Sequence, residues 1–226
     1  MKTLFFGRQD CVYSQQAYNY LAGKNFQITP VWSRHRHDHA VPESFQQSWS
    51  GDYIVSYRSS FILKQKLLNK ARLAAINFHP ASVDYPGSGS YSWALYNQAK
   101  EFGSTVHVMT EQIDSGPIVE QTRWPVYESD TLISLSQRAQ YKLYQLFEST
   151  IDGIVTHGHD YILQKLKQNR HIKWQGKAKR FKDLDHLQKI DPTIEQEHLQ
   201  RIIKATHVPE YPPYIELHGK RFVYTP

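Results

Sequence analysis

The sequence predicts an α/β fold, an open and mostly parallel sheet of the Rossmann-like type with helices on both faces. The first observation is that short apolar runs alternate with helical segments over residues 1–157, as in parallel sheets covered on both sides. The second is length, because 226 residues can bury one such core and still leave a modest appendage. We therefore expect a main domain over 1–157 and a smaller region of basic linker, helix and β-hairpin over 158–226.

Strands in the first part of the chain are predicted from apolar runs that end at turn residues. Gly7 ends the first run, and Gly23 stops the helix that follows it. Pro80 must end the fourth strand, because proline has no N–H to donate to the sheet. The expected strands are 4–6, 28–32, 53–55 and 73–78, and the expected helices are 12–22 and 62–69.

The second part continues the alternation and then changes character. Apolar residues recur every three or four positions between 132 and 154, which indicates one face of a long helix capped by Asp130. Pro192 favours a helix start just after it, and two short β-type runs around 218–219 predict a hairpin. The remaining expected elements are a helix over 93–100, strands over 105–109 and 118–124, a helix over 193–205 and a hairpin over 214–224.

The polar stretch over 33–52 contains an alternating histidine pattern. His35, His37 and His39 suggest a zinc-binding tract. Apart from Asp38, no carboxylate or cysteine lies at ligand spacing, so we expect an exposed loop and no metal site.

Positive charge is concentrated in one part of the chain. The formal charge of the whole chain is +6, whereas residues 161–190 alone carry nine lysines and arginines against two aspartates, a net charge of +7. Such a segment can bind phosphate groups or nucleic acid, and it can equally be a solvated basic surface. The sequence leaves these alternatives open, including a non-catalytic nucleic-acid binder that uses 161–190.

The compartment is predicted from the cysteine content and the first residues. A single cysteine, Cys11, can form no disulfide within the chain, which favours a reducing environment. The apolar run that ends at Gly7 is too short for a signal peptide, and no run approaches the roughly 18 apolar residues of a membrane span. We therefore expect a cytoplasmic protein.

Three polar residues lie where open α/β sheets bind their ligands, outside the carboxyl ends of the strands. Asn77 and His79 flank Phe78 in a predicted strand, so their side chains point to one face. Asp114 follows the next predicted strand. An amide donor, an imidazole and a carboxylate suit acyl transfer to an amine, because they can stabilise an oxyanion and move a proton. The same residue types also serve in turns and caps, so spacing alone does not decide between the two.

Five sequence blocks resemble the signature of the formyltetrahydrofolate-dependent formyltransferases. The resemblance runs in register from about residue 50 to 147, and the blocks as a set are far more specific than any one of them. The blocks are 77–82 (NFHPAS), 85–89 (YPGSG), 93–95 (WAL), 103–107 (GSTVH) and 114–118 (DSGPI).

The resemblance implies a folate-dependent enzyme in which Asn77, His79 and Asp114 are the catalytic residues. It implies N10-formyltetrahydrofolate as formyl donor, no metal, and direct attack by the substrate amine through a tetrahedral intermediate. In such enzymes the pterin ring docks on backbone before the helix that precedes the catalytic strand, and on the loop that leads to the catalytic aspartate. The corresponding positions in this chain are Phe61, Ile62, Leu63, Thr110, Glu111, Gln112 and Ile113.

Within this family, the sequence is most similar to the sugar N-formyltransferases. The Pro-rich stretch and expected hairpin over 211–221, and the loop over 85–91, resemble theirs. The resemblance implies a nucleotide-linked amino sugar as substrate, with dTDP-4-amino-4,6-dideoxyglucose favoured, and a homodimer. The alternative enzyme is a methionyl-tRNA formyltransferase-like protein with a reduced C-terminal region. The candidate substrate contacts are Arg8 for the pyrophosphate and Tyr85, Tyr91 and Trp93 for flat parts of the ligand.

Overall fold

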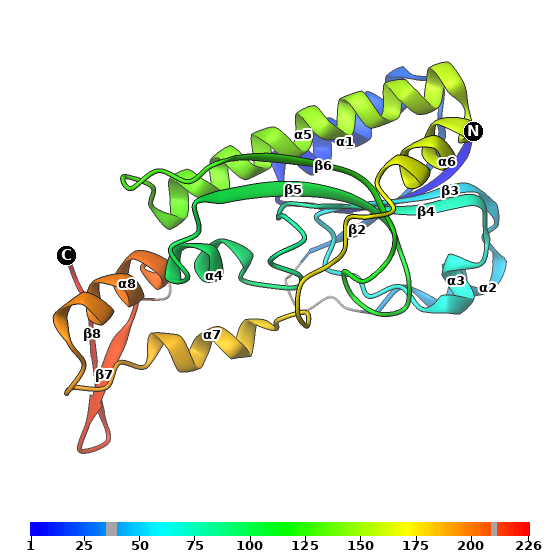
Figure 1. Cartoon of the computed structure of the whole chain (residues 1–226). Helices are drawn as coiled ribbons and strands as arrows, with labels where there is room; N and C mark the ends of the chain where they lie inside the picture. Colours follow the sequence, from blue (N-terminus) through cyan, green and yellow to red (C-terminus); the bar gives the residue numbers. More distant parts are fainter. Residues whose placement is uncertain (35–39, 209–211) are drawn as a thin grey trace.

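The centre of the molecule is a six-stranded sheet (Figure 1). The computed structural model describes residues 1–34, 40–208 and 212–226, with the backbone alone at 44 and 46. The strands are β1 (Lys2–Arg8), β2 (Gln27–Ser33), β3 (Gly51–Tyr57), β4 (Ala71–His79), β5 (Glu101–Val108) and β6 (Ile118–Pro125). Their order is β2-β1-β3-β4-β5-β6; the first four run parallel, and β5 and β6 are antiparallel additions. The predicted open, mostly parallel sheet is confirmed.

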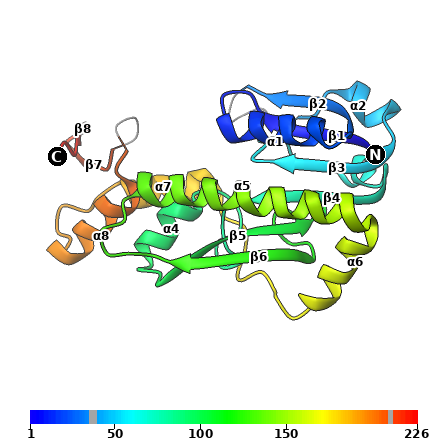
Figure 2. The same ribbon diagram turned by 90° about the horizontal axis from the view of Figure 1, so that it is seen from above.

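Helices cover both faces, because successive side chains of a strand point to opposite sides of the sheet. Phe5 packs in a core cluster with side chains of α1 (Val12–Gly23), α5 (Leu132–His157) and α6 (His159–Gln168). Leu4 and Phe6 pack on the other face with side chains of α2 (Glu43–Ser48) and α3 (Gln65–Leu68). Figure 2 shows α1 and α5 on the same side of the sheet.

The C-terminal region adds helices and a small hairpin. α8 (Gln196–Thr206) packs on α4 (Ser90–Tyr96), and α7 (Phe181–Gln188) precedes it in the chain. β7 (Tyr214–Leu217) and β8 (Lys220–Val223) form the predicted hairpin, which is joined to the preceding chain where the Ile190 N–H donates to the Tyr214 carbonyl at 2.8 Å. In the described ranges, no helix combines the length and the apolar character that crossing a bilayer requires.

Some helices differ from the sequence-based expectation. α2 lies in the stretch predicted to be a loop, and α6 and α7 lie in the basic region where no helix was predicted. α6 fully buries only Ile162 and α7 fully buries no side chain; the prediction for this segment rested on its many charges and not on the helical spacing of its few apolar residues. α4 begins at Ser90, earlier than predicted, directly after Gly89 in a left-handed conformation with φ 73°.

Three helix starts are shifted. α3 begins at Gln65, because Lys64 directly before it has an extended backbone conformation. The side chain that caps α5 is Thr131, which accepts the Ser134 N–H at 3.1 Å, whereas Asp130 accepts the Tyr127 N–H at 2.7 Å. α8 begins at Gln196, later than the start near 193 that Pro192 suggested.

Two features of the sheet bring polar residues together at the end of β4. Because β5 pairs antiparallel with β4, Asn77 lies opposite His107. The 109–117 loop then joins β5 to β6 and folds back closely on β5. A Cβ atom at Gly116 would lie 1.8 Å from the Val108 carbonyl oxygen, so only glycine permits this approach.

Candidate active site

Four polar side chains converge near the end of β4. Asn77 and His79 come from β4, His107 comes from β5, and Asp114 comes from the 109–117 loop. The Asp114 carboxylate lies 3.4 Å from Nδ1 of His79 and 3.3 Å from Nε2 of His107. The Asn77 amide nitrogen lies 3.0 Å from the same nitrogen of His107. The structure thus brings together the three residues singled out from the sequence and adds a second histidine.

Asp114 is held as an ionised carboxylate. It is 7% exposed and adopts a left-handed backbone conformation with φ 43°. The backbone N–H of Gly87 donates to its Oδ2 at 2.7 Å. Burial raises the pKa of Asp114, but His79, His107 and the Gly87 N–H together outweigh burial and lower this pKa to about 2. The carboxylate therefore keeps its negative charge throughout the neutral pH range.

His79 is a buried, neutral imidazole. Its Nε2 lies 3.2 Å from the Tyr85 carbonyl oxygen, which can only accept, so this contact assigns the ring proton to Nε2. Burial lowers the pKa of His79 below the ordinary value of 6.5, and the nearby Asp114 offsets only part of this shift. The unprotonated Nδ1 therefore faces a carboxylate that would stabilise a second proton on the ring.

The protonation state of His79 gives a testable pH dependence. We expect its ring to be mostly neutral at pH 6.5, where an ordinary histidine is half protonated. NMR titration of the histidine rings measures this, with His79→Gln used to assign the signal. Because the unfolded chain binds the proton more readily, His79 removes stability as pH falls from 6.5 toward its lowered pKa. A titration midpoint above 6.5 would show that the field of Asp114 outweighs burial.

His107 connects two members of the cluster. Its Nδ1 donates to the Val108 carbonyl at 3.0 Å, and its Nε2 faces both Asn77 and Asp114. Without a proton on Nε2 the ring accepts from the Asn77 amide, and with one it donates to Asp114. His107 is therefore a positioning residue that the sequence-based set lacks. It lies in the 103–107 block, but the strand register that sets it opposite Asn77 cannot be read from the sequence.

Trp174 covers the cluster from the segment that joins α6 to α7. Its ring lies edge-on to His107 and His79, with centroid distances of 5.0 and 5.6 Å. The indole N–H donates to the Gly116 carbonyl at 2.9 Å, which ties the ring to the loop that carries Asp114. By excluding water, the ring strengthens electrostatic interactions in the cluster. No sequence signal points to Trp174, because it is remote in the chain from the residues that it covers.

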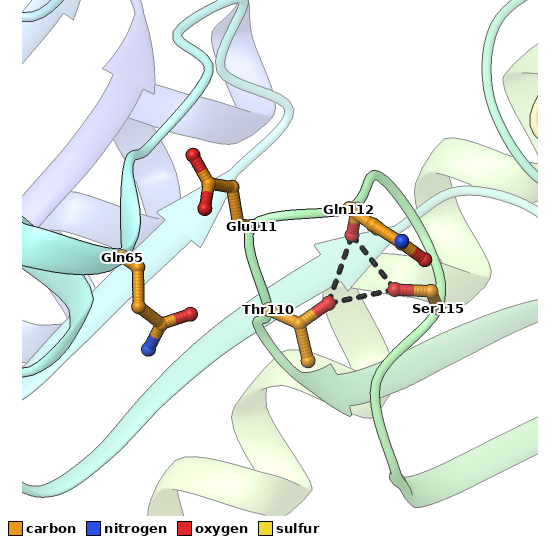
Figure 3. A pocket seen from close by; sticks show the side chains of 5 residues that line it. All are labelled: Gln65, Thr110, Glu111, Gln112 and Ser115. Atoms are coloured by element: carbon orange, nitrogen blue, oxygen red, sulfur yellow. Dashed lines mark hydrogen bonds between the residues drawn. The ribbon is translucent and has the colours of Figure 1, made fainter.

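A pocket of about 610 Å³ opens along the 110–115 part of the loop. Figure 3 shows Gln65 on one side of this pocket and the loop on the other. The hydroxyls of Thr110 and Ser115 lie 2.6 Å apart, and both donate to the Gln112 carbonyl, so the loop is internally braced. Glu111 pairs with Lys64 at 3.7 Å, which links the loop to the segment before α3.

The predicted folate positions belong to the loop that lines this pocket and to the segment just before α3. Thr110, Glu111 and Gln112 line the pocket directly. Ile113 is 49% exposed and lines a neighbouring cleft. The segment 61–63 belongs to no helix or strand and lies just before α3; Leu63 is buried, whereas Ile62 is 37% exposed. The Lys64–Glu111 ion pair shows that the two predicted walls are neighbours in space.

Two of the four predicted substrate contacts lie in very different surroundings. Arg8 is engaged by Asp10 through two hydrogen bonds of 2.7 and 3.0 Å. Tyr85 adjoins the cluster, because its carbonyl accepts from His79. The Tyr85 ring is turned to Phe102, at a centroid distance of 5.8 Å.

The other two predicted contacts are packed aromatic side chains. Tyr91 lies against Phe102 at 5.7 Å, and the ammonium of Lys179 lies 4.8 Å from the centre of the Trp93 ring. The Tyr91 hydroxyl and the Trp93 indole N–H are buried and have no hydrogen-bond partner among the described residues. Among the described residues, no hydrogen bond, ion pair or ring contact links either side chain to the Asn77–His79–Asp114 cluster.

His35, His37 and His39 lie outside the described residues, so the prediction about them stays a prediction. Across 1–34, 40–208 and 212–226, no group of three or more His, Cys, Asp or Glu side chains is arranged to hold a metal ion.

Comparison with known proteins supports the resemblance seen in the sequence. The family model described as formyl transferase matches residues 6–151. GDP-perosamine N-formyltransferase from Brucella melitensis biotype 1 is 27% identical over 179 residues, which are 78% of this chain and 65% of that protein. The chain therefore spans less than two thirds of the length of this relative.

Solved structures show the same fold. A 4-N formyltransferase from Francisella tularensis superposes with a TM-score of 0.73 at 18% identity, covering 99% of this chain and 96% of that one. An N-formyltransferase from Helicobacter canadensis, solved with folinic acid and dTDP-3-aminofucose, superposes with a TM-score of 0.68 at 15% identity, covering 97% and 85%. The shared fold agrees with the family model, which covers more than half of the sequence. The chain belongs to the formyl transferase family.

Proposed function

We propose that the protein transfers a formyl group from N10-formyltetrahydrofolate to the amino group of a nucleotide-linked amino sugar. The observation that carries this proposal is the convergence of Asn77, His79 and Asp114 beside the pocket at 110–115. An amide donor, a neutral imidazole and an ionised carboxylate can stabilise an oxyanion and take a proton from an amine. Membership of the formyl transferase family supports this reaction class.

Each residue has a defined role in the proposed reaction. The amine forms a bond to the formyl carbon, the bond from that carbon to N10 breaks, the amine loses one proton and N10 gains one. The Asn77 amide donates to the formyl oxygen as it becomes negative, whereas the Nε2–H of His79 donates to the Tyr85 carbonyl and holds the ring in place. Asp114 takes the amine proton, either directly or through Nδ1 of His79, which lies 3.4 Å from it. The acceptor amine is itself the nucleophile, so no acyl-enzyme is required.

The formyl donor is a co-substrate that fits the pocket at 110–115. A pterin edge presents several hydrogen-bond donors and acceptors in one plane, and it needs fixed partners. The braced loop offers backbone groups and the hydroxyls of Thr110 and Ser115, with Gln65 opposite. Because Ser115 follows Asp114 directly, a donor bound there would lie next to the catalytic carboxylate. The Helicobacter neighbour solved with folinic acid supports this assignment.

The proposed acceptor is an amino sugar carried on a nucleoside diphosphate. The Brucella relative is named for GDP-perosamine, and the Helicobacter neighbour was solved with dTDP-3-aminofucose. These ligands share an amine on a nucleotide-linked sugar and differ in base and sugar. For this chain we favour dTDP-4-amino-4,6-dideoxyglucose, on the basis of the sequence resemblance.

Mass spectrometry of reaction mixtures tests the proposed function. The protein is incubated with N10-formyltetrahydrofolate and a panel of amino sugars linked to dTDP, UDP or GDP. We expect one formyl group to be added to the amino sugar, most rapidly for dTDP-4-amino-4,6-dideoxyglucose. Methionyl-tRNA is included as the alternative acceptor. Formylation of the tRNA alone, or no formylated product from folded protein, would overturn the proposal.

We also propose that residues 1–157 form the catalytic domain with the folate site, and that the C-terminal hairpin serves assembly as a homodimer. Two strands alone are marginally stable in water, and this hairpin leaves large apolar side chains uncovered. Leu217, Phe222 and Val223 are 45%, 56% and 52% exposed. A second copy of the chain that covers them would remove apolar surface from water.

The hairpin contact predicts a change in mass. Phe222→Ser combined with Val223→Ser should convert a dimer into a monomer, because both side chains are more than half exposed on the free chain. Light scattering coupled to size-exclusion chromatography measures the mass. Ile133→Ser, at a position 50% exposed on α5, is the matched control and should leave the mass unchanged. A monomeric unmodified protein would remove the dimer proposal altogether.

A further inference from the structure

We propose that the cleft between the 112–118 loop and the segment 166–180 binds the diphosphate of the acceptor through Lys173, Lys177 and Arg180. The proposal rests on the proposed function for the identity of the acceptor. Binding of the diphosphate itself does not depend on turnover, so the two proposals can be tested separately.

The cleft is a concave site of about 860 Å³ with two different walls. One wall is the loop that carries Asp114, and the other is the chain between the end of α6 and the start of α7. Apolar side chains, including Ile118, Leu166 and Ile172, lie among its polar groups. The site therefore combines an apolar surface with charge, as ligand sites for partly charged small molecules do.

The charge of the cleft is strongly positive. Asp114 is the single carboxylate among its described lining residues. The lining cations are Arg170, Lys173, Lys177, Lys179 and Arg180. None of these cations forms a salt bridge to a carboxylate within the parts of the chain that the structure describes. By contrast, Lys165 and Lys189, which lie nearer the ends of the same basic region, each pair with a glutamate. Unpaired positive charge in a concave site attracts anions.

The backbone that carries these cations is fixed against the loop next to the active site. The Gln175 N–H donates to the Val83 carbonyl at 2.8 Å, and the Lys179 N–H donates to the Pro86 carbonyl at 3.0 Å. The Ser88 N–H in turn donates to the Lys179 carbonyl at 2.8 Å, which completes a parallel bridge at Gly87. The backbone that carries the cations is therefore already ordered, and binding of a ligand costs little of its conformational entropy.

The position of Asp114 indicates which part of the acceptor enters the cleft. Gln112 and Ser115 line both this cleft and the pocket proposed for the folate, so the loop separates the two sites. An amine that reaches Asp114 from the cleft side leaves the rest of the acceptor beside the cations. Phosphate oxygens there can accept charge-assisted bonds, including paired bonds from the guanidinium of Arg180. Arg8, predicted from the sequence for this task, is paired with Asp10 and does not line the cleft.

Isothermal titration calorimetry with dTDP, without formyl donor, tests the cleft. We expect dTDP to bind the unmodified protein and inorganic pyrophosphate to compete with it. The combined variant Lys173→Ala, Lys177→Ala and Arg180→Ala should weaken dTDP binding by about tenfold or more, because several charge-assisted hydrogen bonds are lost. A matched variant replaces three other lysines with alanine: Lys100, Lys167 and Lys182. These lysines are exposed and do not line the cleft. The affinity of this variant for dTDP should stay within about twofold of that of the unmodified protein, because long-range charge effects are weak.

Several results would overturn the cleft assignment. They are unchanged dTDP affinity in the cleft variant, equal losses in both variants, no competition by pyrophosphate, and no binding of dTDP at all. Preferential binding of random single-stranded DNA would instead assign the segment to nucleic acid. If the expected binding pattern appears without any formyl transfer, the proposed function fails and the anion site stands. If formyl transfer occurs and the cleft variant binds dTDP normally, the proposed function stands and the cleft assignment fails.

Discussion

Replacing Asn77, His79 or Asp114 singly with alanine is expected to lower kcat by about 100-fold or more, the scale of losing an oxyanion donor or a proton-transfer group. The three side chains form one cluster, with Asp114 3.4 Å from His79 and linked to Asn77 through His107. Single-turnover kinetics with formyl donor and amino sugar separates the loss in chemistry from any change in binding.

The pattern across the variants is as informative as the size of each loss. Because the groups act together, the triple variant should be little slower than the worst single variant. Asp114→Asn keeps the shape of the side chain while removing its charge, and it should be nearly as slow as the alanine variant. Asn97, His157 and Asp185 are exposed residues of the same types outside the cluster, and their alanine variants serve as controls that should retain normal turnover. A folded cluster variant with near-normal turnover would exclude that residue from the proposed role.

The nucleotide-linked amino sugar is expected to exceed the free amino sugar in kcat/KM by about 100-fold or more, since remote binding energy positions the reacting amine. In the proposed reaction the diphosphate and the base hold the molecule in place, and the proposed catalytic groups act on an amine that is already oriented. Steady-state kinetics with both acceptors measures the ratio.

A matched control for this second result uses the free amino sugar together with free dTDP. The two separate pieces should restore little activity, because binding energy on one piece cannot orient the other. Equal kcat/KM for the linked and free sugars would show that the nucleotide is not recognised. Efficient formylation of methionyl-tRNA would instead favour the alternative enzyme.

The features that the sequence predicts well are those that depend on residues close together in the chain. The buried run around Phe5 and the alternation of Asn77 and His79 about Phe78 are local patterns, and they located the parallel strands and two members of the cluster. Asp114 was identified because it follows the next predicted strand and begins a block that resembles a known family. Each of these inferences needs only neighbouring residues.

The features that the sequence does not predict depend on contacts between distant segments. His107 enters the cluster through the antiparallel register of β4 and β5, and hydrophobic alternation does not specify which residues face each other across two strands. Trp174 reaches the histidines from a segment whose composition indicated only charge. The same segment contains α6 and α7, whose few apolar residues, such as Ile162 and Leu166, lie among many charged ones, so its composition did not indicate helices.

The parallel bridge between Gly87 and Lys179 limits where this chain can be truncated or joined to the C-terminal region of a relative. Gly87 donates to Asp114 and has φ 86°, and a Cβ atom there would lie 2.2 Å from the Lys179 carbonyl oxygen. Any side chain at this position would displace the basic segment and release the carboxylate at the same time. A fragment that ends at residue 157 would keep Asn77, His79 and Asp114 but lose Trp174 and this support. A chimera that exchanges C-terminal regions between relatives must therefore match both sides of the bridge, even though the change in composition near 157 suggests a convenient junction.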